Sequence, residues 1–187
     1  MKISGGLLKG KRLLFFKSKL TRPLKSIVKE GIFNVINHSS LIKIKLTNSK
    51  ILDLYSGIGT FGLECLSHEA KEVVFVEKNS LAIKYLKSNL ELLKISNKVK
   101  LFDQEISIFL KETKETRFNI IFLDPPFKDQ IYLDYINMIK KRGIISSKNL
   151  FIIHREEINE NLKNLINIDL IKKYGRSKAP RASPKNL

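Results

Sequence analysis

Two short segments of the chain carry residue types that could perform chemistry together. The first, DLYSGIGTFG, covers residues 53–62, and the second, DPPF, covers residues 124–127. Each segment follows a short apolar run, and in an open α/β sheet ligands bind beyond the carboxyl ends of the strands. The two segments could therefore bring a bound cofactor and a planar substrate group to one edge of a sheet.

The first segment has the spacing of a glycine-rich cofactor loop. Asp53 is followed by Gly57, Gly59 and Gly62, and glycines permit a sharp turn and a close approach of a ligand to the backbone. Glu77 ends the next apolar run, where a carboxylate can accept the protons of ribose hydroxyls. These residues predict a nucleoside cofactor, with NAD and S-adenosylmethionine as alternatives.

Asp103 follows the third apolar run and is a further candidate for the cofactor site, at the edge of the adenine. An alternative role is the N-cap of a helix over residues 104–111, because aspartate is favoured at that position. Both roles could coexist.

The second segment predicts a rigid pocket for an amine. Pro125 and Pro126 fix φ and restrict the residues before them to extended conformations. The Asp124 carboxylate and the Pro125 carbonyl could then accept both protons of an exocyclic NH₂ group, while Phe127 stacks on the base. An ordinary strand-end turn is the alternative, since Pro and Asp are common in turns.

An exocyclic base nitrogen is a poor nucleophile because its lone pair is delocalised into the ring. Hydrogen bonds from both its protons to fixed acceptors favour the form with a localised lone pair, and alignment alone contributes about 7–11 kcal/mol in well-oriented systems. The second segment therefore favours S-adenosylmethionine and methyl transfer, and no hydride-transfer constellation supports a dehydrogenase. We expect no covalent enzyme intermediate, and we expect Cys65 to be a buried small residue.

The middle of the chain alternates apolar runs with helical patterns. The expected strands are Ile51–Leu54, Val73–Val76, Val99–Phe102, Ile120–Leu123 and Leu150–Ile153. Helices are expected over residues 80–93, capped by Asn79 or Ser80, and over residues 130–141. This order predicts an α/β fold, a three-layer doubly wound Rossmann-like domain with a mostly parallel sheet.

The first forty residues predict a small N-terminal extension made of a hairpin and a helix. Leu7-Leu8 and residues 13–16 would pair around a Lys9-Gly10-Lys11 turn, and Pro23 would open the helix. The residues expected to face inward on this helix are Leu24, Ile27, Val28, Val35 and Ile36. Its other face would carry Lys25 and Lys29.

The net charge of +17 is concentrated at the two ends of the chain, where residues 1–30 and 163–187 carry +14 of it. Segregated positive charge favours a nucleic acid partner, because basic surfaces bind phosphates by releasing counterions. A solvated helix surface and a lysine-rich genome are the alternatives. The residues expected to bind RNA are Lys9, Lys11, Arg12, Arg22 and Lys25.

The length of 187 residues, with 43% hydrophobic residues, fits one globular unit. We divide it into the extension (1–40), a cofactor-binding domain (41–175) and a basic, mobile tail (176–187). A single cysteine excludes an internal disulfide, and three scattered histidines offer no metal-ligand spacing. No segment has the length of a signal or membrane span, so we expect a cytoplasmic protein without a membrane partner.

The motifs resemble those of class I S-adenosylmethionine-dependent amino methyltransferases. The opening, ISGGLLKGKRL followed by TRPLKSIVKEGIFNVI, is similar to that of the bacterial RsmD-type family. This resemblance implies methylation of the N2 amine of a guanine in 16S rRNA, with guanine 966 as the expected nucleotide. It also implies a small-subunit particle as substrate, a monomeric enzyme, and cofactor and catalytic roles for the residues named above.

The chain departs from the family pattern at two places. Leu24 and Lys25 stand where the family has small threonine-like residues, and RSKAPRASPKNL replaces a hydrophobic closing strand, which leaves residues 166–171 as the last expected strand. Two other functions stay open. DPPF also fits adenine-N6 methylation of DNA or RNA, and a basic RNA-binding protein without catalysis could use the same scaffold.

Overall fold

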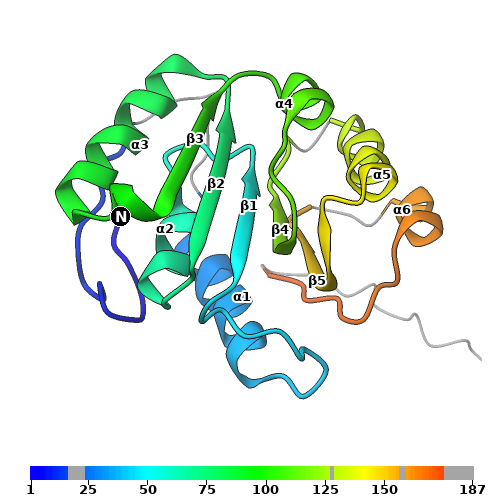
Figure 1. The fold of residues 1–187 in the computed structure, drawn as a ribbon. Coiled ribbons are helices and arrows are strands. Elements are labelled where there is room, and N and C mark those ends of the chain that lie inside the picture. Colours follow the sequence, from blue (N-terminus) through cyan, green and yellow to red (C-terminus); the bar gives the residue numbers. More distant parts are fainter. Residues whose placement is uncertain (17–23, 127–128, 156–158, 175–187) are drawn as a thin grey trace, which may run out of the picture.

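A five-stranded sheet forms the centre of the molecule. The computed structural model describes residues 1–16, 24–126, 129–155 and 159–174. The strands are β1 (Lys50–Leu54), β2 (Glu72–Glu77), β3 (Val99–Asp103), β4 (Phe118–Leu123) and β5 (Ile145–Ile153). They lie in the order β3-β2-β1-β4-β5, and each neighbouring pair is parallel (Figure 1). The expected doubly wound α/β fold is confirmed.

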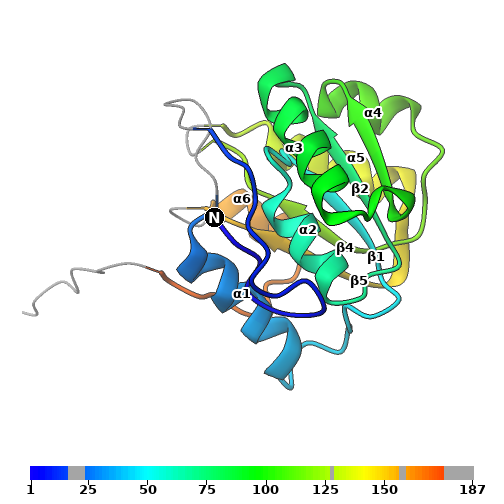
Figure 2. The same ribbon diagram turned by 90° about the vertical axis from the view of Figure 1, so that its left-hand side faces the viewer.

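Helices cover both faces of this sheet (Figures 1 and 2). On one face lie α1 (Ser26–His38), α2 (Thr60–Ser67) and α3 (Ser80–Leu93). On the other lie α4 (Ile106–Glu112), α5 (Tyr132–Arg142) and α6 (Glu160–Leu165), and a short 3-10 helix, η1 (Ser96–Lys98), precedes β3. No helix in the described part of the chain is long and apolar enough to cross a membrane.

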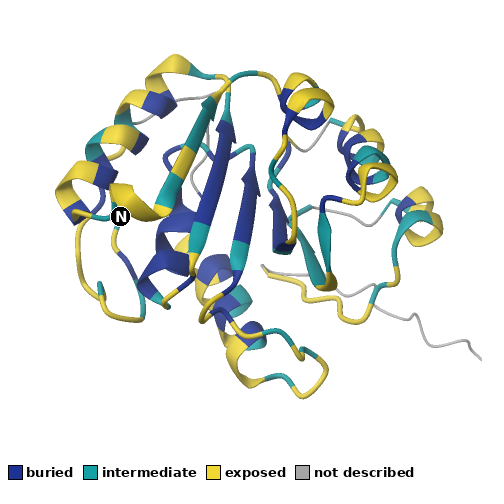
Figure 3. Cartoon of the chain, viewed as in Figure 1, coloured by how far each residue is buried: buried dark blue, intermediate teal, exposed yellow. Residues whose placement is uncertain are grey.

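The central strands are mostly apolar, as expected for strands that are covered on both faces. In β1, Ile51 packs into the core beneath α1 to α3, while Leu52 and Leu54 pack into the core beneath α4 and α5. Most residues of these inner strands are buried, whereas the helices are exposed on their outer sides (Figure 3). A polar residue within β1, such as Asp53, is therefore placed in the interior.

The helix ends follow the local sequence. The side chain of Asn79 caps α3 by accepting a hydrogen bond from the Ala82 N–H at 2.9 Å, as expected from the sequence. Gly143 ends α5 in the left-handed region, with a φ of 61°. The α5 helix begins at Tyr132, two residues after the expected start.

The N-terminal segment differs from the expected hairpin. An antiparallel bridge joins Lys2 to Arg12, and Ile3 donates a backbone hydrogen bond to the Lys11 carbonyl at 2.9 Å. The expected pairing of Leu7-Leu8 with residues 13–16 is wrong, because the Leu7 N–H bonds instead to the Ser67 carbonyl at the end of α2. The extension is therefore held by contacts with α2.

The α1 helix faces the core differently from the prediction. Ile27 is 67% exposed, whereas Lys29, expected on the outer face, is buried at 1% exposure. Both assignments were wrong because a buried acid on α2, Glu64, pairs with Lys29 and turns that side of the helix inward. Pro23, the expected first residue of this helix, lies outside the described residues.

The end of the described chain forms no strand at residues 166–171, so that expectation is wrong. Ile166 and Ile168 pack against the α4–α6 side of the core from irregular backbone, while Leu170 and Ile171 are exposed. The apolar pattern of residues 166–171 therefore does not produce a strand buried on one face. The tail predicted at residues 176–187 lies outside the described part of the chain.

Candidate active site

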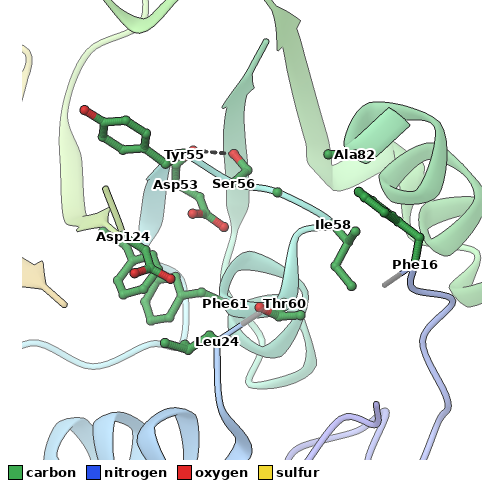
Figure 4. Close-up of a pocket in the computed structure, with 12 residues that line it drawn as sticks. Phe16, Leu24, Asp53, Tyr55, Ser56, Ile58, Thr60, Phe61, Ala82 and Asp124 are labelled. Carbon is green, nitrogen blue, oxygen red and sulfur yellow. Dashed lines mark hydrogen bonds between the residues drawn. The ribbon is translucent and has the colours of Figure 1, made fainter. Parts of the chain in front are cut away.

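Neighbouring strand ends bring the two motifs together. Asp53 in β1 pairs in register with Phe122 in β4, so the glycine loop and Asp124 leave the sheet side by side. They line a common pocket, whose walls include Phe16, Asp53, Gly57, Ile58, Phe61 and Asp124. Figure 4 shows the carboxylates of Asp53 and Asp124 on one side of this pocket and Phe16 on the opposite side.

Asp53 is a buried acid with an incomplete set of partners. Its Oδ2 accepts a hydrogen bond from the Gly62 N–H at 3.0 Å, but its Oδ1 has no hydrogen-bond partner among the described residues. Burial raises the pKa of Asp53 well above its ordinary value, and the nearby charges of Asp124 and Glu77 raise it further. Such a group favours a ligand that brings a positive charge or an N–H donor.

The three glycines of the loop differ in what their missing side chains allow. A Cβ atom at Gly57 would meet no atom of the described ranges within 4 Å, so the backbone is open to the pocket there. Gly59 is the N-cap residue of α2 with a φ of 82°, and a Cβ on it would lie 2.4 Å from Leu86. A Cβ at Gly62 would lie 2.3 Å from the Phe75 ring, so this glycine allows α2 to pack closely on β2.

Glu77 lies at the end of β2 and fixes the loop. Its Oε2 accepts the Gly57 N–H at 2.7 Å, and its Oε1 accepts the N–H groups of Lys78 and Asn79 at 2.9 and 2.8 Å. The hydroxyl of Ser56 donates to the Asp53 carbonyl at 2.6 Å and so ties the loop to β1. The glycine loop is thus held from both neighbouring strands.

Asp103 is the last residue of β3 and lies beside Glu77 in the strand register. It is exposed and does not cap a helix, because α4 begins at Ile106 with Glu105 as its N-cap residue. The expected capping role is therefore wrong. The expected cofactor role stays a prediction.

Asp124 follows β4 and makes a contact that the sequence did not reveal. Its Oδ1 lies 2.8 Å from Nδ1 of His154, the residue that follows β5. The Pro126 carbonyl accepts hydrogen bonds from the Asp129 N–H and the Arg155 guanidinium, both at 2.8 Å. Phe127 lies outside the described residues.

Two aromatic residues near the pocket were also missed by sequence reasoning. Phe16, from the N-terminal segment, lines the pocket and packs against Tyr85 of α3, with ring centroids 5.0 Å apart. Tyr55, which follows β1, lines the pocket and donates its hydroxyl to Asp129 at 3.0 Å. Burial and the charge of Asp129 raise the pKa of Tyr55, so its hydroxyl stays protonated.

The basic residues expected to contact RNA lie on the surface where the structure describes them. Lys9, Lys11 and Arg12 are exposed on the N-terminal segment, and Lys25 is exposed at the start of α1. Arg22 lies outside the described residues. Within the described ranges, no cluster of three or more His, Cys, Asp or Glu side chains could hold a metal ion, and Cys65 is buried as expected.

Comparison with known proteins places the chain in a family. Residues 1–180 match the family described as "Conserved hypothetical protein 95". The chain belongs to this family. This family is the RsmD family. The resemblance that the N-terminal and loop motifs indicated is therefore confirmed.

Relatives in the family share most of their length with the chain. The ribosomal RNA small subunit methyltransferase D of Haemophilus influenzae is 30% identical, over 84% of this chain and 79% of the relative. The protein of the same name in Buchnera aphidicola is 30% identical, over 95% and 87%. A solved structure of yhhF from Escherichia coli, a provisionally assigned methyltransferase, superposes with a TM-score of 0.70 at 27% identity, covering 82% and 78%.

Proposed function

We propose that the chain transfers a methyl group from S-adenosylmethionine to the exocyclic N2 amine of a guanine in 16S rRNA, with guanine 966 as the expected nucleotide. The observation that carries this proposal is the shared pocket of Asp53 and Asp124 at the ends of adjacent strands. Family relatives named ribosomal RNA small subunit methyltransferase D support the rRNA substrate.

The loop residues fit S-adenosylmethionine. The unpartnered Oδ1 of Asp53 is suited to a cationic or N–H-bearing group, and the negative charges around it favour a sulfonium. The open backbone at Gly57 admits a ligand, and Glu77 would accept the ribose hydroxyl protons with its remaining lone pairs. Asp103 would contact the adenine edge, while Gly59 and Gly62 shape the loop.

Asp124 would receive the amine. Its Oδ2 and the Pro125 carbonyl are the two acceptors for the two N–H groups, and holding both protons localises the lone pair on nitrogen. S-adenosylmethionine, when bound, supplies a methyl group on a sulfonium sulfur that leaves with the electron pair of the broken C–S bond. The Asp124 carboxylate would take the proton that the methylated nitrogen releases. Phe127 would stack on the guanine.

The exposed cations of the N-terminal segment would hold the RNA backbone. Lys9, Lys11, Arg12 and Lys25 lie on the surface, and Phe16 connects the same segment to the pocket. Arg22 would add to this surface. We place the enzyme in the cytoplasm, as a monomer acting on the small subunit or its assembly intermediate, with the 1–40 extension as the RNA-binding part and 41–175 as the catalytic domain.

The test is a methyl-transfer assay with three substrates. The protein is incubated with labelled S-adenosylmethionine and undermethylated small subunits, naked 16S rRNA or DNA, and the modified base is mapped. We expect N2-methylguanine in 16S rRNA. Asp124→Asn should lower kcat by about 10²–10³-fold, since it weakens a fixed acceptor. It should lower cofactor affinity far less, because Asp53 and Glu77 keep their charges.

The control is Asp134→Asn, which changes an exposed acid on α5 and should keep full activity. Methylation at adenine N6, and not at guanine N2, would support the alternative function that the DPPF motif also fits. A protein that binds the cofactor and RNA but transfers no methyl group would instead be a non-catalytic RNA-binding protein. Full activity of Asp124→Asn would remove the role assigned to that carboxylate.

A further inference from the structure

His154 and Asp124 occupy equivalent places on adjacent strands. Leu123, the last residue of β4, pairs in register with Ile153, the last residue of β5, so the next residues, Asp124 and His154, leave the sheet together. The His154 N–H donates to the Leu123 carbonyl at 3.0 Å, which extends the ladder by one bond and fixes the backbone of His154. The sheet therefore fixes the point from which the imidazole extends.

The side chains meet at hydrogen-bond distance. Nδ1 of His154 lies 2.8 Å from Oδ1 of Asp124, and the two side chains are 23% and 21% exposed. An ionised carboxylate only accepts hydrogen bonds, so Nδ1 carries the proton and donates it. This contact consumes one oxygen of the carboxylate and leaves Oδ2 for a ligand.

We infer that His154 is a positioning residue for methyl transfer: it fixes the rotation of the Asp124 carboxylate so that Oδ2 faces the amine of the target base. The inference rests on the function proposed above. The carboxylate torsion of aspartate is broad and roughly two-fold, so without a partner on Oδ1 the acceptor would sample orientations that do not match the Pro125 carbonyl. A preset acceptor avoids that loss at each turnover.

The residue after His154 stabilises the backbone next to Asp124. Arg155 donates to the Pro126 carbonyl at 2.8 Å, and its guanidinium lies 4.6 Å from the centroid of the Tyr132 ring. Consecutive residues after β5 thus contact the Asp124 side chain and the carbonyl two residues later. The two residues that follow β5 therefore hold the turn that is proposed to bind the substrate.

If His154 positions Asp124, its loss should lower turnover without weakening cofactor binding. His154→Ala should lower kcat by about 10–100-fold, the usual effect of misplacing a reacting group. Affinity for S-adenosylmethionine, measured by calorimetry, should stay within about 2-fold, since the proposed cofactor residues belong to β1, the loop after it, and the ends of β2 and β3, none of which pairs with β5. His154→Asn should restore most of the turnover, because its amide nitrogen can occupy the Nδ1 position, whereas His154→Gln places its nitrogen farther out and should restore less.

His38→Ala is the matched control, since His38 is an exposed residue at the end of α1 and should keep wild-type turnover. Wild-type turnover of His154→Ala would overturn the role of His154 while leaving the proposed function intact. Equal losses in the Ala and Asn variants, together with a lower melting temperature, would make the contact merely structural and also overturn it. A wild-type protein that transfers no methyl group to any of the three substrates would overturn the proposed function and the inference together.

Discussion

Two buried carboxylates, eleven residues apart in the chain, are treated in opposite ways by the fold. Glu64 of α2 is 1% exposed and is fully paired: it accepts the N–H groups of Ser4 and Gly5 at 2.8 and 2.7 Å and forms an ion pair with Lys29. Asp53 of β1 is also 1% exposed, but its Oδ1 has no partner in the part of the chain that the structure describes. The first acid attaches the N-terminal segment, and the second faces a pocket.

The difference separates structural burial from functional burial. A buried charge is tolerated when hydrogen bonds and an opposite charge compensate it, as at Glu64, and it costs free energy when they do not. Asp53 keeps an uncompensated oxygen beside Asp124 and Glu77, which is the pattern expected where a ligand completes the site. The contrast between the two acids can be tested by removing the cation that compensates Glu64 or the charge of Asp53.

The largest effect is expected at Lys29. Lys29→Met leaves the Glu64 carboxylate buried without its cation, so we expect the free energy of unfolding to fall by about 3–5 kcal/mol. Thermal and denaturant unfolding measure this loss. Lys25→Met, an exposed lysine one turn earlier in the chain, should change stability by less than about 0.5 kcal/mol.

A second variant identifies the cause. In the Lys29→Met background, Glu64→Gln removes the uncompensated charge but keeps an acceptor for Ser4 and Gly5, so it should recover part of the lost stability. Unchanged stability of Lys29→Met would mean that the pair does not attach the N-terminal segment. A further loss on adding Glu64→Gln would show that the charge was not the problem.

The pairing at Lys29 also marks the limit of what the sequence predicts. The strands and the glycine loop could be predicted because their signals are local: apolar runs, glycine spacing and an acid at a strand end lie within a few residues. Lys29 and Glu64 are thirty-five residues apart, and a lysine in an amphipathic helix is normally solvated. Only the packing of α1 against α2 shows that this lysine lies inside.

The same limit applies to His154. Asp124 carries a recognisable motif, whereas His154 has no motif and lies thirty residues later. It could have been found by aligning the ends of β4 and β5, since residues that follow paired strand ends are neighbours. That step needs the exact register, and β4 and β5 contain a register shift between Phe118 and Ile120.

A smaller, opposite effect is expected at Asp53. Asp53→Asn keeps an acceptor for the Gly62 N–H and removes the buried charge, so we expect the free energy of unfolding at neutral pH to rise by about 1–3 kcal/mol. Because the folded pKa of Asp53 is raised, the wild-type protein holds this proton more tightly when folded. Its stability should therefore fall, relative to the variant, as pH rises from the unfolded pKa of about 3.9 to the folded pKa.

Unfolding measured across that pH range for the wild type, Asp53→Asn and the exposed control Asp134→Asn checks the sign. The variant should also bind S-adenosylmethionine more weakly, so stability and affinity should move in opposite directions. A less stable Asp53→Asn protein would show that the carboxylate is compensated in the fold, and the contrast with Glu64 would disappear.

The smallest effect on stability is expected at the exposed cations that the Lys29–Glu64 pair helps to hold in place. Lys9→Gln combined with Lys11→Gln should change the free energy of unfolding by less than about 0.5 kcal/mol, because both side chains lie on the surface. Their proposed partner is the RNA backbone, so binding should respond instead: each lost phosphate contact lowers the slope of log affinity against log salt by about 0.7–0.9.

Lys141→Gln with Lys148→Gln removes the same charge from α5 and β5, away from the N-terminal segment, and should leave the slope unchanged. Equal slopes for the two double variants would mean that net charge, and not the attached N-terminal segment, attracts the RNA.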